Sequence, residues 1–387
     1  MMKWVIDVSL RNRFLVFFLA GVAVVAGGWA ALRLPIDAVP DITNRQVQIN
    51  TLVPSLSPEE VEAQVTFPVE TAISGTPGLV STRSLSRNGF SQVTAIFRDD
   101  TDIYFARQQL NERLVTARET LPPGAEPILG PNATGLGEVY WWTVSYAPKP
   151  QQPRGGEPGW QPDGTYLTPQ DEMLSTPLER LTYLRTIQDW TIRPRLLSVP
   201  DVAGVDSSGG YVRQLEVQPD PARLVDYGIT LDQLAAAIEG SNIGTGAGFI
   251  ESRGTAYIAR ADSRFRSADD VTKAVVTTYG STPVTVGDLA RVVPGKEQRM
   301  GSASANGEEV VLGIGLMRIG GNSRTVADAL GEKLQEIRPS LPPDIKVTTV
   351  LERTKLVNAT IRTVAFNLFG GALLVIIVLL LTIGDFR

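Results

Sequence analysis

The sequence contains no cysteine and no histidine, and it has five methionines. Without histidine the chain has no imidazole general base, no Ser-His-Asp triad and no imidazole metal ligand. Without cysteine it has no thiolate nucleophile, no disulfide and no thiolate-based zinc or iron–sulfur site. Any metal chemistry in this chain must therefore use carboxylates, carbonyl oxygens or methionine sulfur.

The sequence also lacks an excess of positive charge. The 36 Lys and Arg residues stand against 41 Asp and Glu residues, which gives a formal net charge of −5. This balance argues against a nucleic-acid partner. With 387 residues, of which 43% are hydrophobic, the chain is long enough for two or three folded domains.

Two apolar runs frame the chain, at residues 14–32 and 364–383. Every residue of the first run is apolar or glycine, and Asn367 and Thr382 interrupt the second. A helix of the first run's length spans roughly 28 Å, close to the thickness of a bilayer core. A cleaved signal peptide is the alternative, but its apolar region is shorter, about 7–15 residues. We therefore expect two transmembrane helices.

The charges next to the first run predict the orientation. Lys3, Arg11 and Arg13 outweigh Asp7, so the positive-inside rule places residues 1–13 in the cytoplasm. The segment between the runs then lies on the far side, which is the periplasm in a bacterium with two membranes. Neither run contains Asp, Glu, Lys or Arg. The two runs therefore offer no ionisable relay for coupling to a proton gradient.

The segment between the runs alternates strand and helix patterns. Residues 46–53 alternate in polarity, and a capping box from Ser57 to Glu60 begins a helix in which Pro68 should produce a kink. A strand around 92–97 and a helix from Asp102 follow. Strands and helices in this order predict an α+β fold with a ferredoxin-like (split βαβ) unit.

A weak internal echo predicts a second copy of this unit. A second capping box runs from Thr176 to Glu179, and a Ser/Gly segment at 207–210 precedes an alternating strand at Leu215 and Val217. Residues 147–164 hold five prolines and four glycines without periodicity, so we expect an exposed insertion or loop there.

Two carboxylates are candidate site residues. Glu138 follows Gly135 and Gly137, which allow the backbone to approach a neighbour closely, and Asp206 lies at the matching edge of the second unit. On the residues alone, both also fit a solvated carboxylate. The acidic cluster at 99–102 is explained by the dipole of the helix that follows it.

The aromatic residues Tyr140, Trp141 and Trp142 are expected to pack in a core or an interface. The glycine-rich segment 244–248 lacks the third glycine and the Lys-Ser/Thr pair of phosphate-binding loops, so we expect a flexible loop.

Several ordered segments carry a family likeness that runs nearly from end to end. They are Asn12–Val16, Leu34–Asp41, Ser57–Glu62, Gly130–Glu138, Gln188–Trp190, Val199–Ala203 and Gln218–Leu224. With these segments the chain resembles the heavy-metal-efflux branch of the resistance-nodulation-division (RND) transporters, of the cobalt–zinc–cadmium type.

The resemblance implies two transmembrane helices that flank periplasmic porter subdomains with an inserted docking subdomain. The expected ranges are porter subdomain 1 at 38–133, the first part of porter subdomain 2 at 134–211 with its Pro/Gly-rich insertion at 147–177, the docking subdomain at 212–272, and the second part of porter subdomain 2 at 273–352. It also implies a homotrimer in the bacterial inner membrane, a periplasmic adaptor (membrane fusion) protein, an outer-membrane channel, and exchange of protons for metal ions.

The chain departs from the family pattern at its end, because Arg387 follows closely after the second run. Members of the family have twelve spans. The resemblance therefore implies the N-terminal portion of a pump, incomplete for transport alone.

The same resemblance gives Glu138 and Asp206 the place of acidic metal ligands. The shortage of methionine favours zinc, cobalt or cadmium over the soft ions copper and silver. The ion is cargo, and we expect no cofactor and no catalytic residue. A copper/silver pump fragment, a periplasmic sensor or receptor module and a membrane-anchored enzyme are the alternatives. The last is disfavoured by the missing His and Cys.

Overall fold

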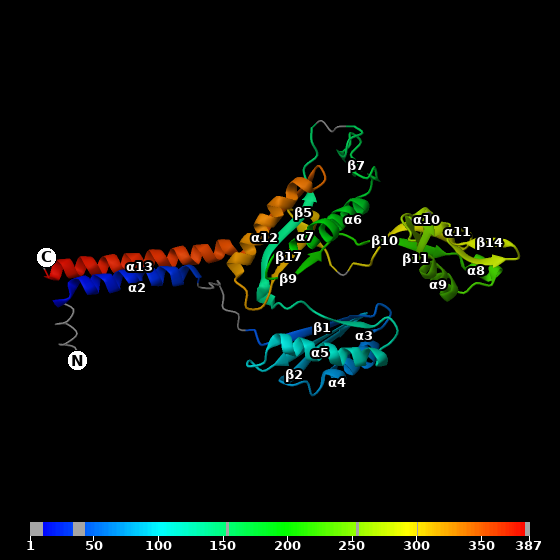
Figure 1. Cartoon of the computed structure of the whole chain (residues 1–387). Coiled ribbons are helices and arrows are strands. Elements are labelled where there is room, and N and C mark those ends of the chain that lie inside the picture. Colours follow the sequence, from blue (N-terminus) through cyan, green and yellow to red (C-terminus); the bar gives the residue numbers. More distant parts are fainter. Residues whose placement is uncertain (1–10, 34–42, 152–154, 253–254, 300, 384–387) are drawn as a thin grey trace.

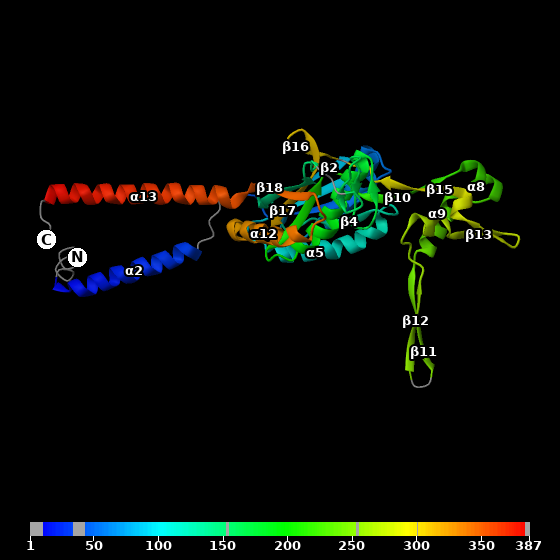
Figure 2. The same ribbon diagram turned by 90° about the horizontal axis from the view of Figure 1, so that it is seen from above.

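The structure, a computed structural model, describes residues 11–33, 43–151, 155–252, 255–299 and 301–383. Along the chain, folded α+β bodies separate two long helices, α2 (Arg13–Arg33) and α13 (Arg353–Ile383). Both helices leave the same end of the folded part (Figures 1 and 2). The segment 34–41 and most of the expected cytoplasmic segment 1–13 lie outside the described residues.

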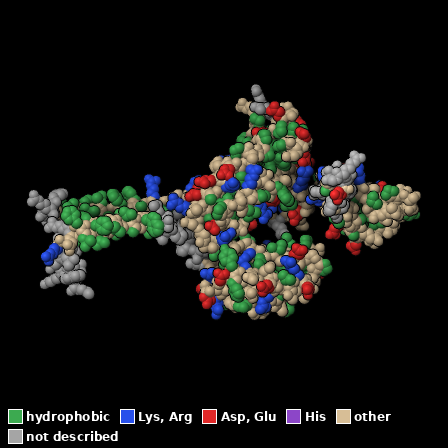
Figure 3. Space-filling model, in the orientation of Figure 1, with side chains coloured by type: hydrophobic (Ala, Val, Ile, Leu, Met, Phe, Trp, Pro, Cys, Tyr) green, Lys and Arg blue, Asp and Glu red, His purple; other side chains and the backbone are tan. Residues whose placement is uncertain are grey.

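The two long helices differ in apolar length. Within the described ranges, one helix is long and apolar enough to cross a membrane, over Arg353–Thr382, whereas the apolar stretch Phe14–Ala30 is shorter. Hydrophobic side chains cover α2 and α13, which overlap in the view of Figure 3 but lie apart in Figure 2. The last strand of the folded part, β18 (Ile345–Glu352), continues into α13 without an intervening loop.

The first body is an antiparallel sheet with the strand order β2-β3-β1-β4, covered by helices. Its elements are β1 (Gln46–Leu52), α3 (Pro58–Val61), α4 (Phe67–Ile73), β2 (Leu79–Arg87), β3 (Phe90–Phe97), α5 (Ile103–Ala117) and β4 (Glu126–Leu129). The alternation predicted for residues 46–53 is confirmed, since Val47, Ile49, Thr51 and Val53 are buried. Asp102 caps α5 by accepting a hydrogen bond of 2.8 Å from the backbone N–H of Phe105.

A π-helical turn at Glu62–Thr66 joins α3 to α4. It ends directly before Phe67, the first residue of α4, which Pro68 follows. Proline lacks the N–H of a regular helix and its ring collides with the preceding turn. The wider π turn accommodates it. The irregularity that we expected Pro68 to produce thus takes the form of a π turn in the preceding residues. The second body repeats this arrangement at Gln188–Ile192, before Pro194.

The second body repeats the topology of the first. Its main elements are β5 (Glu138–Tyr146), α6 (Pro177–Ile187), α7 (Arg193–Leu196), β9 (Val202–Ser208), β16 (Ala303–Ala305), β17 (Glu308–Met317), α12 (Ser323–Ile337) and β18 (Ile345–Glu352). The sheet order β9-β17-β5-β18 matches β2-β3-β1-β4, with β16 added beside β17. Both bodies therefore have the ferredoxin-like strand order.

The internal sequence repeat predicted that the strand equivalent to β3 in this second copy contains Leu215 and Val217. This prediction is wrong. These residues lie in β10 (Arg213–Pro219), which pairs with β15 (Ala290–Lys296) in a separate sheet. The strand that occupies the position is β17, about a hundred residues after β9 in the chain. A long segment is thus inserted between two neighbouring strands.

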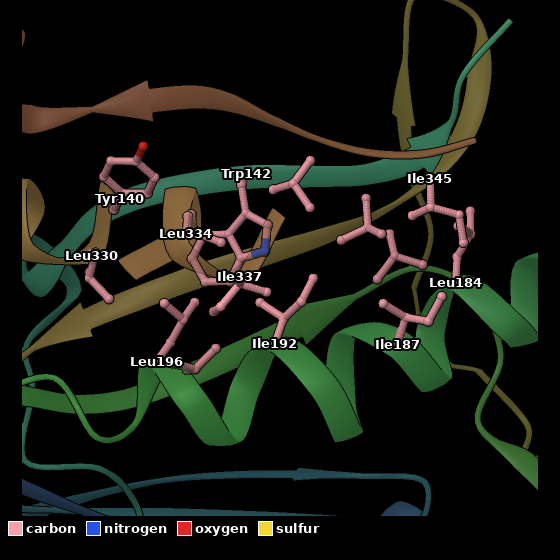
Figure 4. Packing of buried hydrophobic residues seen from close by; sticks show 14 of the residues in the cluster. Tyr140, Trp142, Leu184, Ile187, Ile192, Leu196, Leu330, Leu334, Ile337 and Ile345 are labelled. Atoms are coloured by element: carbon pink, nitrogen blue, oxygen red, sulfur yellow. The ribbon is translucent and has the colours of Figure 1, made fainter. Parts of the chain in front are cut away.

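Helices α6, α7 and α12 cover one face of the second sheet and form the main core with it (Figure 4). Trp142 is fully buried at its centre. Its indole N–H donates a hydrogen bond of 2.9 Å to the side-chain oxygen of Gln188, which is buried as well. The core thus satisfies its largest polar-tipped side chain internally.

The inserted segment forms a third body with a core of its own. Its elements are β10, α8 (Pro221–Tyr227), α9 (Leu231–Ser241), β11 (Gly244–Ser252), β12 (Thr255–Asp262), α10 (Ala268–Thr272), β13 (Val275–Tyr279), β14 (Thr282–Thr285), α11 (Val286–Leu289) and β15. Because β10 pairs with β15, this body continues to Lys296, beyond the boundary at 272 that the sequence suggested. The glycine-rich segment 244–248 lies in β11, and β11 and β12 project as a hairpin (Figure 2).

The Pro/Gly-rich insertion is more ordered than we expected. Its described residues form three short paired strands, β6 (Gly159–Trp160), β7 (Tyr166–Leu167) and β8 (Met173–Leu174). Trp160, Tyr166 and Leu174 are buried against the main core. The expectation of an exposed loop at 147–164 is therefore wrong for residues 159–161, which are buried, because Trp160 packs with other aromatic side chains although the segment has no periodic pattern.

Candidate functional site

Glu138 and Asp206 lie in the same sheet, on either side of strand β17. Glu138 begins β5 and pairs with Leu316, and Asp206 in β9 pairs with Ile314. Residues directly opposite each other in an antiparallel pair point to the same face. The register thus places both carboxylates on the face opposite the helices.

A bulge in β5 makes this arrangement possible. Between Tyr140 and Glu138 the register shifts by one residue relative to Gly315 and Leu316. Val139 and Tyr140 are both buried in the helix-covered core. The extra residue turns Glu138 to the other face, as bulges commonly do at functional positions.

The two carboxylates do not by themselves close a metal site. Two strand spacings and an offset of two residues separate their Cα atoms by about 12 Å. Within the described ranges, no group of three or more Asp, Glu, His or Cys side chains is positioned to hold a metal ion. The structure therefore brings the two predicted residues to one face, with Ile314 and Leu316 between them.

Close backbone packing fixes the segment before Glu138. A Cβ atom at Gly137 would lie 2.9 Å from the carbonyl oxygen of Met317, so this position requires glycine, as predicted, whereas Gly135 has open space around it. Arg353 donates a hydrogen bond to the carbonyl oxygen of Leu136. The first residue of α13 is thereby connected to the loop that positions Glu138.

Asp206 is exposed at the surface of the sheet, yet the surrounding protein partly desolvates its carboxylate. This desolvation raises the pKa of Asp206 above the usual aspartate value, and the positive charge of Arg193 acts in the opposite direction. A raised pKa means that a proton competes more effectively with a cation for this carboxylate.

A polar network begins at Ser207, next to Asp206 in the sequence but on the helix-covered face of the sheet. Ser207 donates 2.7 Å to Asp189, and Gln188 donates 3.3 Å to Ser207. Arg185 pairs with Asp189 at 2.5 Å and donates 2.9 Å to the carbonyl oxygen of Gly209. No local pattern predicts this network, because single polar residues in an amphipathic helix do not reveal their partners.

The remaining candidates have structural roles. Asp102 is a helix cap, and Asp100 pairs with Arg98 at 3.3 Å on the surface. Tyr140 and Trp142 are core residues, as predicted, and Trp141 lies on the opposite face beside Ile314.

Comparison with known proteins gives one consistent result. The chain is 51% identical over its whole length to the nickel and cobalt resistance protein CnrA of Cupriavidus metallidurans, of which it covers 36%. It is 50% identical to the nickel-cobalt-cadmium resistance protein NccA of Alcaligenes xylosoxydans xylosoxydans, again over its whole length and 36% of the relative. The cation efflux protein CusA of Escherichia coli is 34% identical and 34% covered.

Comparison with solved structures also finds heavy-metal efflux proteins. A crystal structure of a heavy metal efflux pump matches 98% of this chain and 35% of its own, with a TM-score of 0.81 and 31% identity. The chain thus spans about a third of the length of the curated relatives that it matches. The likeness to heavy-metal RND transporters that the motifs carried is confirmed. Because the family described as AcrB/AcrD/AcrF matches residues 5–387, this chain belongs to that family of transporters.

Proposed function

We propose that this chain is the N-terminal third of an inner-membrane pump that exports divalent heavy-metal cations in exchange for protons. The observation that carries the proposal is the identity of 50–51%, over the whole chain, to two proteins named for nickel and cobalt resistance. The relative whose printed name is cation efflux system protein CusA is more distant, at 34%.

The proposed architecture assigns a role to each body. Helices α2 and α13 are the first two membrane spans, and the three bodies lie between them in the periplasm. The first and second bodies are porter subdomains, and the third, Arg213–Lys296, is the docking subdomain. In the assembled pump we propose a homotrimer that engages a periplasmic adaptor and an outer-membrane channel.

Glu138 and Asp206 are the proposed cation ligands of this part. Carboxylate oxygens suit borderline divalent ions such as cobalt, nickel, zinc and cadmium better than copper(I) or silver. Their spacing on one sheet face fits two successive binding positions on the route of the cation through the pump. The rest of the pump supplies the remaining ligands. The raised pKa of Asp206 favours release of the ion when the carboxylate takes up a proton.

Substitution in a transporter of the relatives' full length, carrying this chain as its first third, tests the proposal. Glu138→Gln and Asp206→Asn should each lower cobalt and nickel tolerance and leave the amount of protein in the membrane unchanged. Glu126→Gln, at an exposed position on β4, is the matched control. Unchanged tolerance in both variants would remove the two carboxylates from the path.

A further inference from the structure

A buried hydrogen-bond donor lies on the carboxylate face, the face of the second sheet that carries Glu138 and Asp206. Trp141 is half-buried, but its indole nitrogen is enclosed by protein. Among the residues that the structure describes, no acceptor lies within hydrogen-bond distance of this N–H. A buried donor without an acceptor destabilises the folded state, and native structures retain few such groups. The donor therefore indicates an acceptor that approaches it in another state of the protein.

The bulge in β5 makes Glu138 a close neighbour of Trp141 on this face. Trp141 lies opposite Ile314 and Glu138 lies opposite Leu316, so both side chains belong to the same face. Ile314 and Leu316 are two residues apart in β17, which corresponds to about 7 Å along a strand. The extra residue of the bulge thus brings Glu138 and Trp141 to the spacing of adjacent residues on one face. Asp206 is farther away, because its strand is the second from β5.

The other neighbours of Trp141 on the carboxylate face offer a weaker acceptor or none. The two residues directly opposite it, Ile314 and Leu351, are apolar. Thr143 follows on the same strand, and its hydroxyl donates a hydrogen bond of 3.5 Å to a backbone carbonyl oxygen. A carboxylate accepts about twice as strongly as a neutral oxygen. Glu138 is therefore the favoured acceptor.

The backbone that carries Glu138 is fixed, whereas its carboxylate is not. Arg353 donates to the carbonyl oxygen of Leu136, and Gly137 packs closely against the carbonyl oxygen of Met317. Within the described ranges, the Glu138 carboxylate accepts no hydrogen bond and forms no ion pair. Carboxylates that bind a metal ion are usually oriented by a hydrogen bond from an outer partner. This partner is still missing for Glu138.

We infer that Trp141 is the positioning residue for Glu138. When Glu138 binds the cation through one carboxylate oxygen, the indole N–H of Trp141 donates to the other oxygen. The hydrogen bond orients the ligand and gives the buried donor its acceptor, so cation binding and this hydrogen bond favour each other. This role of Trp141 rests on the proposed function of Glu138 as a ligand.

Calorimetric titration with cobalt(II) tests the role of Trp141, in a detergent-solubilised transporter of the relatives' full length that carries this chain as its first third. Trp141→Phe keeps an aromatic ring and removes the donor. It should weaken cobalt binding about 10–100-fold, the usual effect of losing an outer hydrogen-bond partner. Trp141→Gln removes the ring and keeps an N–H donor, so its affinity should stay within about threefold of the native value. A residue that only packs would give the opposite order.

Glu138→Gln separates the role of Trp141 from the proposed function. If Glu138 is a ligand, this change alone lowers the cobalt affinity, and Trp141→Phe added to it should have no further effect. Trp190→Phe is the matched control, because Trp190 is 80% exposed and lies in the π-helical turn Gln188–Ile192. The control should bind cobalt as the native protein does.

Three results would overturn the role of Trp141 and leave Glu138 as a ligand. They are native affinity in Trp141→Phe, equal losses in Trp141→Phe and Trp141→Gln, and a loss from Trp141→Phe that is equally large in the Glu138→Gln background. The last result would assign another acceptor, such as Thr143, to the indole N–H. Native affinity in Glu138→Gln alone would instead remove the ligand, and the role of Trp141 with it.

Discussion

The indole ring of Trp142 packs directly over the backbone of Gly313, on the neighbouring strand of the second sheet. The two residues are paired in the register, and a Cβ atom at position 313 would overlap the ring. The absence of a side chain at position 313 leaves the space that the Trp142 ring, the largest side chain of the core, occupies.

Gly313→Ala should therefore destabilise the chain, although alanine is ordinarily better tolerated than glycine in a strand. Overpacking of this kind costs about 1–3 kcal/mol. Denaturant unfolding of the chain in detergent measures the loss. Gly301→Ala is the control, since a Cβ there has ordinary contacts, and an equally small effect of both changes would contradict the packing argument.

Gln188→Leu should destabilise the core through its partner. The change leaves the Trp142 indole N–H buried without an acceptor, which costs about 1–3 kcal/mol. A double-mutant cycle with Trp142→Phe isolates the hydrogen bond. If Gln188→Leu costs as much in the Trp142→Phe variant as in the native chain, the bond contributes nothing.

Asp206→Asn should change how stability depends on pH. Because the pKa of Asp206 is raised in the folded state, its ionisation costs stability once the pH exceeds the unfolded value near 3.9. The native chain should thus be less stable than the Asn variant at neutral pH, and the difference should vanish in acid. Unfolding curves between pH 3 and 7 check this, and parallel curves would contradict the desolvation of Asp206.

Glu172→Gln should change the position of the third body relative to the insertion more than it changes the free energy of unfolding. Both oxygens of Glu172 accept from Arg213, at 2.9 and 3.1 Å, which connects the insertion to the strand that enters the third body. Half-exposed pairs contribute less than about 1 kcal/mol. Spin labels at Gln170→Cys and Asp226→Cys should nevertheless report a broader distance distribution.

The control for that measurement is Asp100→Asn, which breaks the exposed pair with Arg98 inside the first body. The same distribution in all three proteins would show that the Glu172–Arg213 pair does not hold the two bodies together.

Local signals predicted much of this fold. The predicted capping boxes at Ser57 and Thr176 both form, and the buried residues of α5 follow the apolar spacing of its sequence. Each of these features depends on residues within one or two helical turns, which is the range over which a sequence pattern acts directly.

Pairing between distant segments was not predictable in this way. Strand periodicity marked Leu215 and Val217 as a strand, but it carried no information on whether β3-like pairing or pairing with β15 would follow. The two-residue strands around Trp160 and Tyr166 are too short to show a period at all. Their order comes from tertiary burial.

In the candidate site, too, local features were predictable from the sequence and long-range ones were not. The glycines before Glu138 indicated a close backbone contact there, and position 137 does require glycine. The bulge that turns Glu138 toward the face of Asp206 depends on the register with β17, some 170 residues later, and no local pattern reports it. The polar network around Ser207 and Asp189 was missed for the same reason.

Single-cysteine labelling tests the central claim most directly, because the native chain contains no cysteine. Ser84→Cys on the first body, Ser198→Cys on the second and Asp232→Cys on the third lie at exposed positions. In cells with a permeabilised outer membrane and an intact inner membrane, all three should react with a membrane-impermeant maleimide. Labelling that appears only after the inner membrane is broken would place the folded bodies in the cytosol and contradict the account.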